Sequence, residues 1–349
     1  MLRGQLLTLT LAVLFLQTGV SGAPDYEQNL WNLFSFRHSH SPPVARPTCP
    51  EAQELDVLGL MSWLLFSSLV LMVGVWSGWS QRGKEKSPEQ IMLADRKLDF
   101  FVGALSVAAT WAAGGATIGA AQAVFSQGLL WSLAPVFYSL SLAVGGLLFA
   151  NKMRSAKYFT MMDPFTQKFG LWGSVLVIPA ALSEVIWCAA VLSSLGSALH
   201  IILQLDQTFS IVISAGLALA YTMLGGLRSV AYTDVVRVIF IIFGLFLALP
   251  FTISHPAVSS LTDDENPLWW GTVSSHQTGA WLDISLLCLL GGIPWQSYFQ
   301  RVLAAQSASQ AVLLSCGGAI LALVVSLPAL LLGAVAGQRA SRKYFNRKQ

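Results

Sequence analysis

The feature that most restricts the fold is a series of long apolar stretches, each able to cross a lipid bilayer as a helix. Eight spans are expected, at Asp56–Trp79, Leu98–Val124, Leu129–Ala150, Leu171–Leu195, Phe209–Leu224, Ala231–Thr252, Trp281–Val302 and Ala311–Ala336. Only 11% of the 349 residues are charged, whereas soluble domains carry about 25% charged residues. The sequence therefore predicts an all-α, multi-span membrane protein.

The basic residues alternate between the two sides of the predicted helices. Lys and Arg follow the first, third and fifth spans and close the seventh, at Arg82, Lys84, Lys86, Arg96, Lys97, Lys152, Arg154, Lys157, Lys168, Arg228 and Arg301. The loops 200–208 and 254–280 contain neither residue type. Because basic loops stay in the cytoplasm, the pattern predicts an extracellular N-terminus in a plasma-membrane protein.

The two ends of the chain differ from the predicted transporter domain, residues 56–337. Residues 1–22 have the shape of a signal peptide, although an uncleaved anchor is the alternative, and residues 23–55 read as an extracellular Pro-rich segment. Residues 338–349 form a basic tail that would lie outside, against the charge rule. Either the eighth span does not fully cross or is followed by something absent, or the tail replaces further helices. We favour replacement.

The sequence lacks the patterns of several other function classes. It has no zinc-ligand spacing, no phosphate-binding Gly-rich loop and no Ser/His/Asp nucleophile set. We therefore expect neither an enzyme, a resident metal nor an organic cofactor, and the short basic loops do not indicate nucleic acid. Cys188, Cys288 and Cys316 lie in spans as small core residues, whereas Cys49 is either an unpaired thiol or an intermolecular bridge.

Two of the spans are predicted to be interrupted. The seventh contains Gly291-Gly292-Ile293-Pro294-Trp295, followed by polar and aromatic residues up to Arg301. The second contains small residues from Thr110 to Gly119, with Trp111 just before Gly114-Gly115. Broken backbone at membrane depth is tolerated where it lines a cavity, and paired broken helices carry the midplane sites of transporters. Close helix packing is the simpler reading of the small residues.

Four aromatic residues are candidates for the lining of such a site: Trp111, Tyr138, Trp187 and Trp295. The three tryptophans are mid-span, where the usual role in an interfacial belt does not apply. Each ring face attracts a cation by about 0.5–2 kcal/mol. The set suggests a quaternary ammonium such as choline.

Four charged residues within the spans are further candidates, because charge at membrane depth is costly, and one of them, Asp283, lies close to the outer end of the seventh span. Glu184, three residues before Trp187, is read either as a functional group or as a structural hydrogen bond to a neighbouring helix. Asp234 and Arg237 are read as a structural pair near a helix end.

Several longer stretches carry a resemblance to a known family. They are Ala109-Thr110-Trp111 with Gly114-Gly115, Tyr138-Ser139-Leu140-Ser141-Leu142, Asp163-Pro164-Phe165, Val230-Ala231-Tyr232-Thr233-Asp234 and Gly291-Gly292-Ile293-Pro294-Trp295-Gln296. With these stretches the chain resembles the choline branch of the sodium/solute symporter family, nearly continuously from Asp56 to Gly337.

The resemblance implies a LeuT-like fold of two inverted five-helix repeats, here with the second repeat truncated. It implies uptake of choline coupled to sodium and dependent on chloride, at the plasma membrane or a synaptic vesicle membrane. By matched position, Trp111, Tyr138, Trp187 and Trp295 form the ammonium cage. Backbone near Ala108 and Trp111 holds sodium, and Glu184 is a functional charge.

Three departures from the family pattern qualify this expectation. The N-terminal signal indicates a paralogue. The family's tyrosine, asparagine and glutamate after Gly115 are replaced by a stretch containing Ala116, Thr117, Ile118 and Gln122, so ion coupling or affinity is expected to differ. The family continues with further helices beyond the match. The alternative function is therefore a non-transporting membrane protein that associates with or regulates a full-length transporter as an oligomer.

Overall fold

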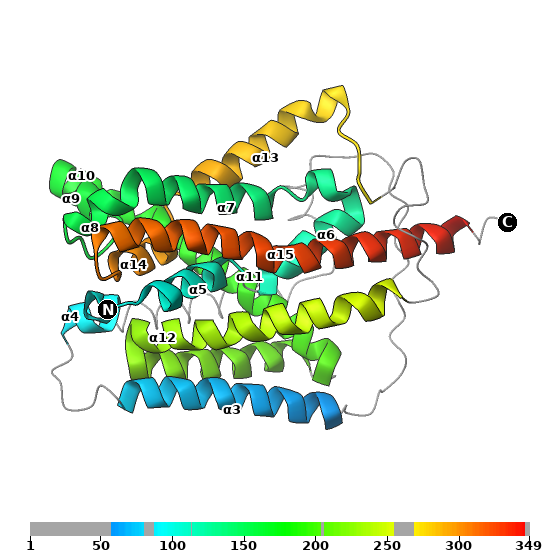
Figure 1. Ribbon diagram of the computed structural model, residues 1–349, viewed down its shortest axis with the longest axis horizontal. Helices are drawn as coiled ribbons and strands as arrows, with labels where there is room; N and C mark the ends of the chain where they lie inside the picture. The colour runs from blue at the N-terminus through cyan, green and yellow to red at the C-terminus, as the bar shows by residue number, and fades with distance from the viewer. Residues whose placement is uncertain (1–56, 80–86, 113, 204–205, 255–268, 346–349) are drawn as a thin grey trace. The chain divides into compact units, whose positions relative to one another are not determined.

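The structure is a computed structural model that describes residues 57–79, 87–112, 114–203, 206–254 and 269–345 (Figure 1). These ranges are helical and contain no strand, which confirms the predicted helical class. The predicted signal peptide, the Pro-rich segment and Cys49 lie outside the described residues.

Six apolar helical segments in the described part of the chain are long enough to cross a membrane. They are Val57–Trp79, Leu129–Ser155, Leu171–His200, Gly226–Ile253, Ser275–Leu303 and Ala308–Gly337. A bent pair, Phe100–Trp111 with Ala116–Gln127, makes a seventh if it counts as one span, and Thr208–Ala220 is a shorter apolar helix. The protein is thus a multi-pass membrane protein, while the count of eight spans stays a prediction.

The chain divides into two compact units, of which the first comprises residues 1–68 and 179–219. It contains the first part of α3 (Val57–Trp79), most of α11 (Val177–Leu203) and the start of α12 (Gln207–Ile253). Leu192, Ile211 and Ala215 form its buried cluster, with Cys188 packed against them. Cys188 therefore has the core role that the sequence predicts.

The second unit, residues 69–178 and 220–349, is built around the long helix α15 (Ala308–Phe345). This helix packs against α5 (Phe100–Trp111), α6 (Gly114–Gln127) and α7 (Ala134–Gly145) (Figure 1). A Cβ on Gly318 would lie 2.5 Å from Val107 Cγ1, and one on Gly333 would lie 2.3 Å from the Ala121 oxygen. Glycines in α15 thus permit backbone-level contact with its neighbours.

Short helices complete the second unit. They are α4 (Pro88–Leu93), η1 (Ala94–Arg96), η2 (Leu129–Trp131), the π-helix η3 (Gly146–Ala150), α8 (Asn151–Ser155), α9 (Asp163–Phe169), α10 (Leu171–Val175), η4 (Ser275–Gln277), α13 (Thr278–Gly291) and α14 (Gln296–Leu303). Side-chain caps mark the starts of α4 and α5. Ser87 accepts a bond from Gln90 N at the start of α4, and Asp99 accepts one from Phe101 N at the start of α5.

The predicted fifth and sixth spans both lie within α12, whose range contains two helices that meet at a kink at Gly226. Gly226 has φ 58° and ψ −153°, a conformation that strongly favours glycine. A Cβ there would also lie 2.7 Å from the Ile91 oxygen. The second helix begins directly after Gly226, so the two predicted spans are separate helices whose connection is shorter than the stretch 225–230 that the sequence predicts.

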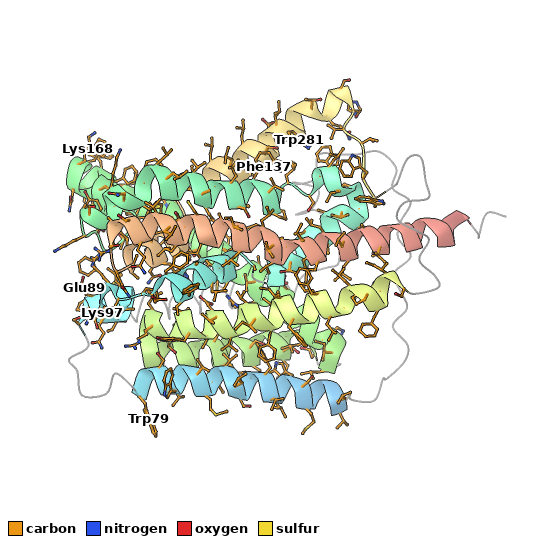
Figure 2. The ribbon with its side chains drawn as sticks, viewed as in Figure 1. Trp79, Glu89, Lys97, Phe137, Lys168 and Trp281 are labelled. Atoms are coloured by element: carbon orange, nitrogen blue, oxygen red, sulfur yellow. The ribbon has the colours of Figure 1, made fainter. Side chains whose placement is uncertain are left out.

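The segment around Trp269 fixes α13 beside α7. Leu129 N donates to the Trp269 oxygen at 2.8 Å, and Trp281 Nε1 donates to the Leu130 oxygen at 2.9 Å. The Trp281 ring also meets the edge of Phe137, with centroids 6.1 Å apart (Figure 2). These contacts determine how the break after α13 approaches α7.

Candidate functional site

The second predicted span is interrupted, as the sequence predicts. α5 ends at Trp111, α6 begins at Gly114, and the two parts of the span are bent by 48°. Ala112 leaves helical geometry, with φ −73° and ψ 34°. Glycine tolerates non-helical backbone at low cost, which explains a break beside Gly114. Trp111 thereby ends a helix while only 4% of it is exposed.

The seventh span is interrupted as well. α13 ends at Gly291 and α14 begins at Gln296. Pro294 has no N–H to continue a helical ladder, and Trp295 is extended, with φ −93° and ψ 118°. The predicted break is confirmed, and half-buried Trp295 lies at the entry to α14.

The two breaks meet at α7. Trp111 stacks on Tyr138 with ring centroids 4.4 Å apart and an interplanar angle of 30°. Gly292 lies against the same tyrosine, since a Cβ on it would be 2.7 Å from Tyr138 Cδ1 and 2.5 Å from Ser141 Oγ. Two of the four predicted cage residues, Trp111 and Tyr138, are thus in contact. The backbone just before a third, Trp295, packs against the same helix, α7.

Two buried hydroxyl groups lie on the same helix. Ser139 is 6% exposed and Ser141 is fully buried, and neither Oγ has a hydrogen-bond partner among the described residues. Buried polar atoms in proteins normally have a partner, either in the protein or in ordered water. Ser141, beside Gly292, can therefore offer a hydrogen bond to a water or to a small polar solute.

The remaining predicted residues, Trp187 and Glu184, lie half-buried on α11 in the first unit. Trp111, Tyr138 and Trp295 belong to the second unit. The complete four-residue cage and the role of Glu184 therefore stay predictions.

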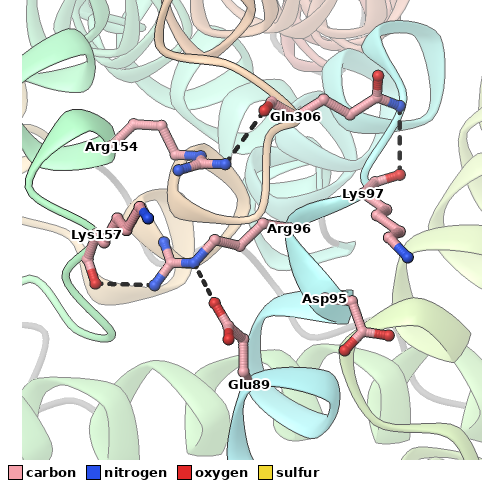
Figure 3. A pocket seen from close by; sticks show the side chains of 7 residues that line it. All are labelled: Glu89, Asp95, Arg96, Lys97, Arg154, Lys157 and Gln306. Carbon is pink, nitrogen blue, oxygen red and sulfur yellow. Dashed lines mark hydrogen bonds and ion pairs between the residues drawn. The ribbon is translucent and has the colours of Figure 1, made fainter.

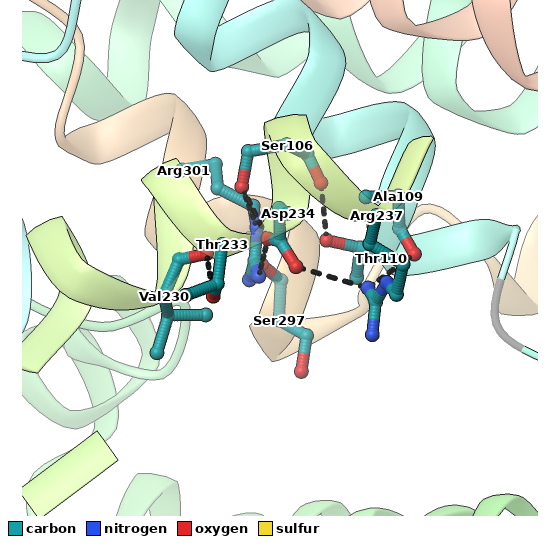
Figure 4. A network of polar contacts seen from close by, with 9 residues as sticks. All are labelled: Ser106, Ala109, Thr110, Val230, Thr233, Asp234, Arg237, Ser297 and Arg301. Atoms are coloured by element: carbon teal, nitrogen blue, oxygen red, sulfur yellow. Dashed lines mark hydrogen bonds and ion pairs between the residues drawn. The ribbon is translucent and has the colours of Figure 1, made fainter. Parts of the chain in front are cut away.

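A cluster of ion pairs joins α5, which ends at the first break, to α12 and α14 (Figure 4). Asp234 Oδ2 accepts hydrogen bonds from Ser106 Oγ at 2.6 Å and from Arg301 Nη2 at 3.0 Å. Asp234 Oδ1 accepts one from Arg237 Nη2 at 2.9 Å. Asp234 and Arg301 are only 4% and 7% exposed. One carboxylate thus ties together α5, α12 and α14, and the predicted pairing of Asp234 with Arg237 is confirmed.

The cluster reaches the backbone of the broken span. Arg237 Nη2 donates to the Ala109 oxygen at 2.9 Å, a carbonyl near the end of α5. Ala108, predicted to help bind sodium, is fully buried, and its oxygen accepts a bond from Ala112 N at 2.8 Å. The backbone that is expected to bind sodium is thus held by a helical hydrogen bond and by the guanidinium group of Arg237.

Arg301 and Ser106 are the members of this cluster that sequence reasoning missed. Arg301 was counted among the loop charges, yet it lies within α14, and its Nε donates to Ser106 Oγ at 3.0 Å. One signal was available, because Arg301 follows the predicted break by only two turns. Ser106 offers no comparable signal, since a serine in a small-residue helix usually only aids packing.

Three comparisons place these features among known proteins. The profile of the Sodium:solute symporter family matches residues 91–341. The chain is 45% identical to human high affinity choline transporter 1 over 291 residues, which is 80% of this chain and 50% of that protein. It is 42% identical to the Drosophila melanogaster high-affinity choline transporter 1, over 81% of this chain and 46% of that protein. The chain thus spans about half the length of the curated relatives it matches.

More distant proteins are also similar to this chain. A sodium/glucose cotransporter of Vibrio parahaemolyticus is 26% identical over 74% of this chain and 51% of its own. The solved structure of a Na+-coupled sialic acid symporter, in a substrate-bound outward-open state, superimposes with a TM-score of 0.67 at 14% identity. That match covers 82% of this chain and 62% of the symporter chain, and it shows a shared fold.

Proposed function

The chain belongs to the sodium:solute symporter family, and we propose that it moves choline across the membrane together with sodium. The stack of Trp111 on Tyr138, where two broken spans meet α7, is the observation that carries this proposal. Ring faces attract a quaternary ammonium, and broken helices bear the substrate and ion sites of many secondary transporters. Relatives that are 39–45% identical to this chain are high-affinity choline transporters, which supports choline as the solute.

Each candidate residue has a role in this proposal. Trp111, Tyr138, Trp187 and Trp295 surround the ammonium, and Ser141 bonds the hydroxyl group of choline. Backbone oxygens near Ala108 and Trp111 hold sodium, and Glu184 supplies a nearby negative charge. The transport cycle is alternating access in the plasma membrane, with an extracellular N-terminus and with chloride dependence inferred from the family resemblance.

Charge selectivity at this site gives a direct test. We expect choline to inhibit uptake of radiolabelled choline at least about tenfold more strongly than 3,3-dimethylbutan-1-ol, a neutral molecule of the same shape. Two or more ring faces at about 0.5–2 kcal/mol each account for such a factor. The measurement is inhibition of sodium-dependent uptake by cells that express this chain. Equal inhibition by the two molecules would contradict the aromatic cage.

Substitution of Trp111 tests whether its ring takes part in choline binding. Trp111→Ala should abolish most choline binding, whereas Trp172→Ala is a matched control, since Trp172 is 82% exposed. A separate measurement of choline binding to the purified chain distinguishes a protein that transports choline from one that only binds it. Binding without sodium-dependent uptake by surface-expressed protein would favour the non-transporting alternative, which the comparisons do not otherwise support.

A further inference from the structure

A second polar site lies at one end of the helices of the second unit. It is a pocket of about 700 Å³, lined by Glu89, Asp95, Arg96, Lys97, Arg154, Lys157 and Gln306 (Figure 3). Four of its residues are basic and two are acidic. The lining comes from three segments, which follow the first, third and seventh predicted spans. None of its members takes part in the proposed choline site.

Two arginines hold the three segments together. Arg96 Nη2 donates to the Lys157 oxygen at 2.9 Å, and its Nη1 donates to the Leu303 oxygen at 3.2 Å. Arg154 Nε donates to the Ala305 oxygen at 2.6 Å. Arg96 donates three hydrogen bonds to backbone carbonyls and Arg154 donates two, and these bonds fix the shape of the pocket.

The positive charge of the pocket is only partly balanced within the described residues. Glu89 pairs with Arg96 at 2.5 Å, but neither Lys97 nor Lys157 forms an ion pair there. In Figure 3 the side chains of Arg96, Arg154 and Lys157 gather on one side of the pocket. Four cations face only two carboxylates in this pocket, so a net positive charge remains, and the cations repel one another unless an anion lies between them. The geometry therefore favours an anionic ligand.

The surroundings indicate that this ligand comes from a lipid. Figure 2 shows Trp79, Glu89, Lys97 and Lys168 at the same end of the helices. Trp79 is 61% exposed, and such amphipathic rings are typical of the membrane–water interface. One to two turns before Arg154, Leu147 and Leu148 are 64% and 56% exposed within a predicted span. Apolar surface for acyl chains thus adjoins a pocket at headgroup level.

We propose that this pocket binds the phosphate group of an anionic membrane phospholipid. Lys157 and the remaining donors of Arg154 contact the phosphate oxygens, Lys97 adds positive potential from the opposite wall, and the acyl chains lie along α7 and η3. The bound headgroup bridges the segments that Arg96 and Arg154 already join. This proposal does not depend on the nature of the transported solute.

Binding of defined lipids to the purified full chain tests the proposal. The probes are dioctanoyl phosphatidic acid, dioctanoyl phosphatidylcholine and inorganic phosphate, each titrated in detergent. We expect phosphatidic acid to bind more tightly than phosphatidylcholine, and Lys97→Gln with Lys157→Gln to weaken that binding by roughly tenfold or more. The double variant Lys152→Gln with Lys168→Gln is the matched control, because both of its lysines are exposed outside the pocket.

The arms of the experiment separate the sources of the phosphate group. Inorganic phosphate that binds as tightly as phosphatidic acid would overturn the lipid assignment in favour of a free anion. Equal losses of affinity for phosphatidic acid in the two double variants would show that net charge alone attracts the lipid. That result would overturn the assignment of the lipid to this pocket. The proposal is supported if the control variant binds phosphatidic acid within about twofold of wild type while the pocket variant binds it much more weakly. Choline binding measured alongside should be unchanged in both double variants.

Discussion

Asp234→Asn is expected to destabilise the protein by about 3–5 kcal/mol, the range for breaking a buried ion pair from one side. Asparagine has nearly the same shape, so packing is retained. The substitution removes the negative charge that faces Arg301, whose side chain is 8% exposed, and Arg237, whose side chain is 38% exposed. Most of the loss comes from Arg301, because water screens the exposed partner. The measurement is the unfolding midpoint of purified protein in one detergent.

A matched control and a double variant make this result specific. Asp283→Asn removes the same charge from an exposed position and should leave the free energy of unfolding within about 0.5 kcal/mol of wild type. Arg301→Gln alone should destabilise strongly, yet Asp234→Asn with Arg301→Gln should cost less than the sum of the single changes. Additive losses would show that the two side chains do not stabilise each other.

The ion cluster also affects the proposed transport site. Arg237 bridges Asp234 and the Ala109 oxygen, two residues before Trp111. Loss of the carboxylate frees this guanidinium and leaves the end of α5 less firmly held. Choline affinity should therefore fall in Asp234→Asn even under conditions in which the variant stays folded. Broken backbone at membrane depth is stable only where such partners satisfy it.

Much of the fold could be predicted because apolar length and glycine or proline placement are local signals. Pro294 predicts the break before α14, and the pair Gly114-Gly115 predicts the bend after α5. The abrupt kink at Gly226 could not be predicted from local signals. The kink places Gly226 against the Ile91 oxygen, a contact between residues far apart in the sequence.

The candidate site was predictable only where its chemistry is unusual for a span. A mid-span tryptophan such as Trp111 or an aspartate such as Asp234 stands out in the sequence. The partner of each does not, because pairing depends on how helices pack. Arg301 resembles a loop charge until α14 turns it toward Ser106. Ser141 resembles a packing residue until the break at Gly292 comes to lie against it.

The adjacent glycines of the seventh span give the second large expected effect. Gly292→Ala should strongly weaken choline binding and lower stability by about 1–3 kcal/mol, the usual cost of overpacking. The new methyl group would lie 2.7 Å from Tyr138 Cδ1 and 2.5 Å from Ser141 Oγ. Ser141 can rotate its hydroxyl away. Tyr138 can yield only by moving its ring, which disturbs the stack with Trp111.

Gly291→Ala is the control for this change, because nothing lies within 4 Å of a Cβ at that position. Both variants add one methyl group at the end of α13, and alanine is a better helix former than glycine. Radiolabelled choline binding and the unfolding midpoint should therefore stay near wild type in Gly291→Ala and fall in Gly292→Ala. Equal effects would mean that backbone flexibility of the glycine pair, rather than contact with Tyr138, governs binding. A loss of stability in Gly292→Ala with unchanged choline affinity would separate the stacked rings from the choline site.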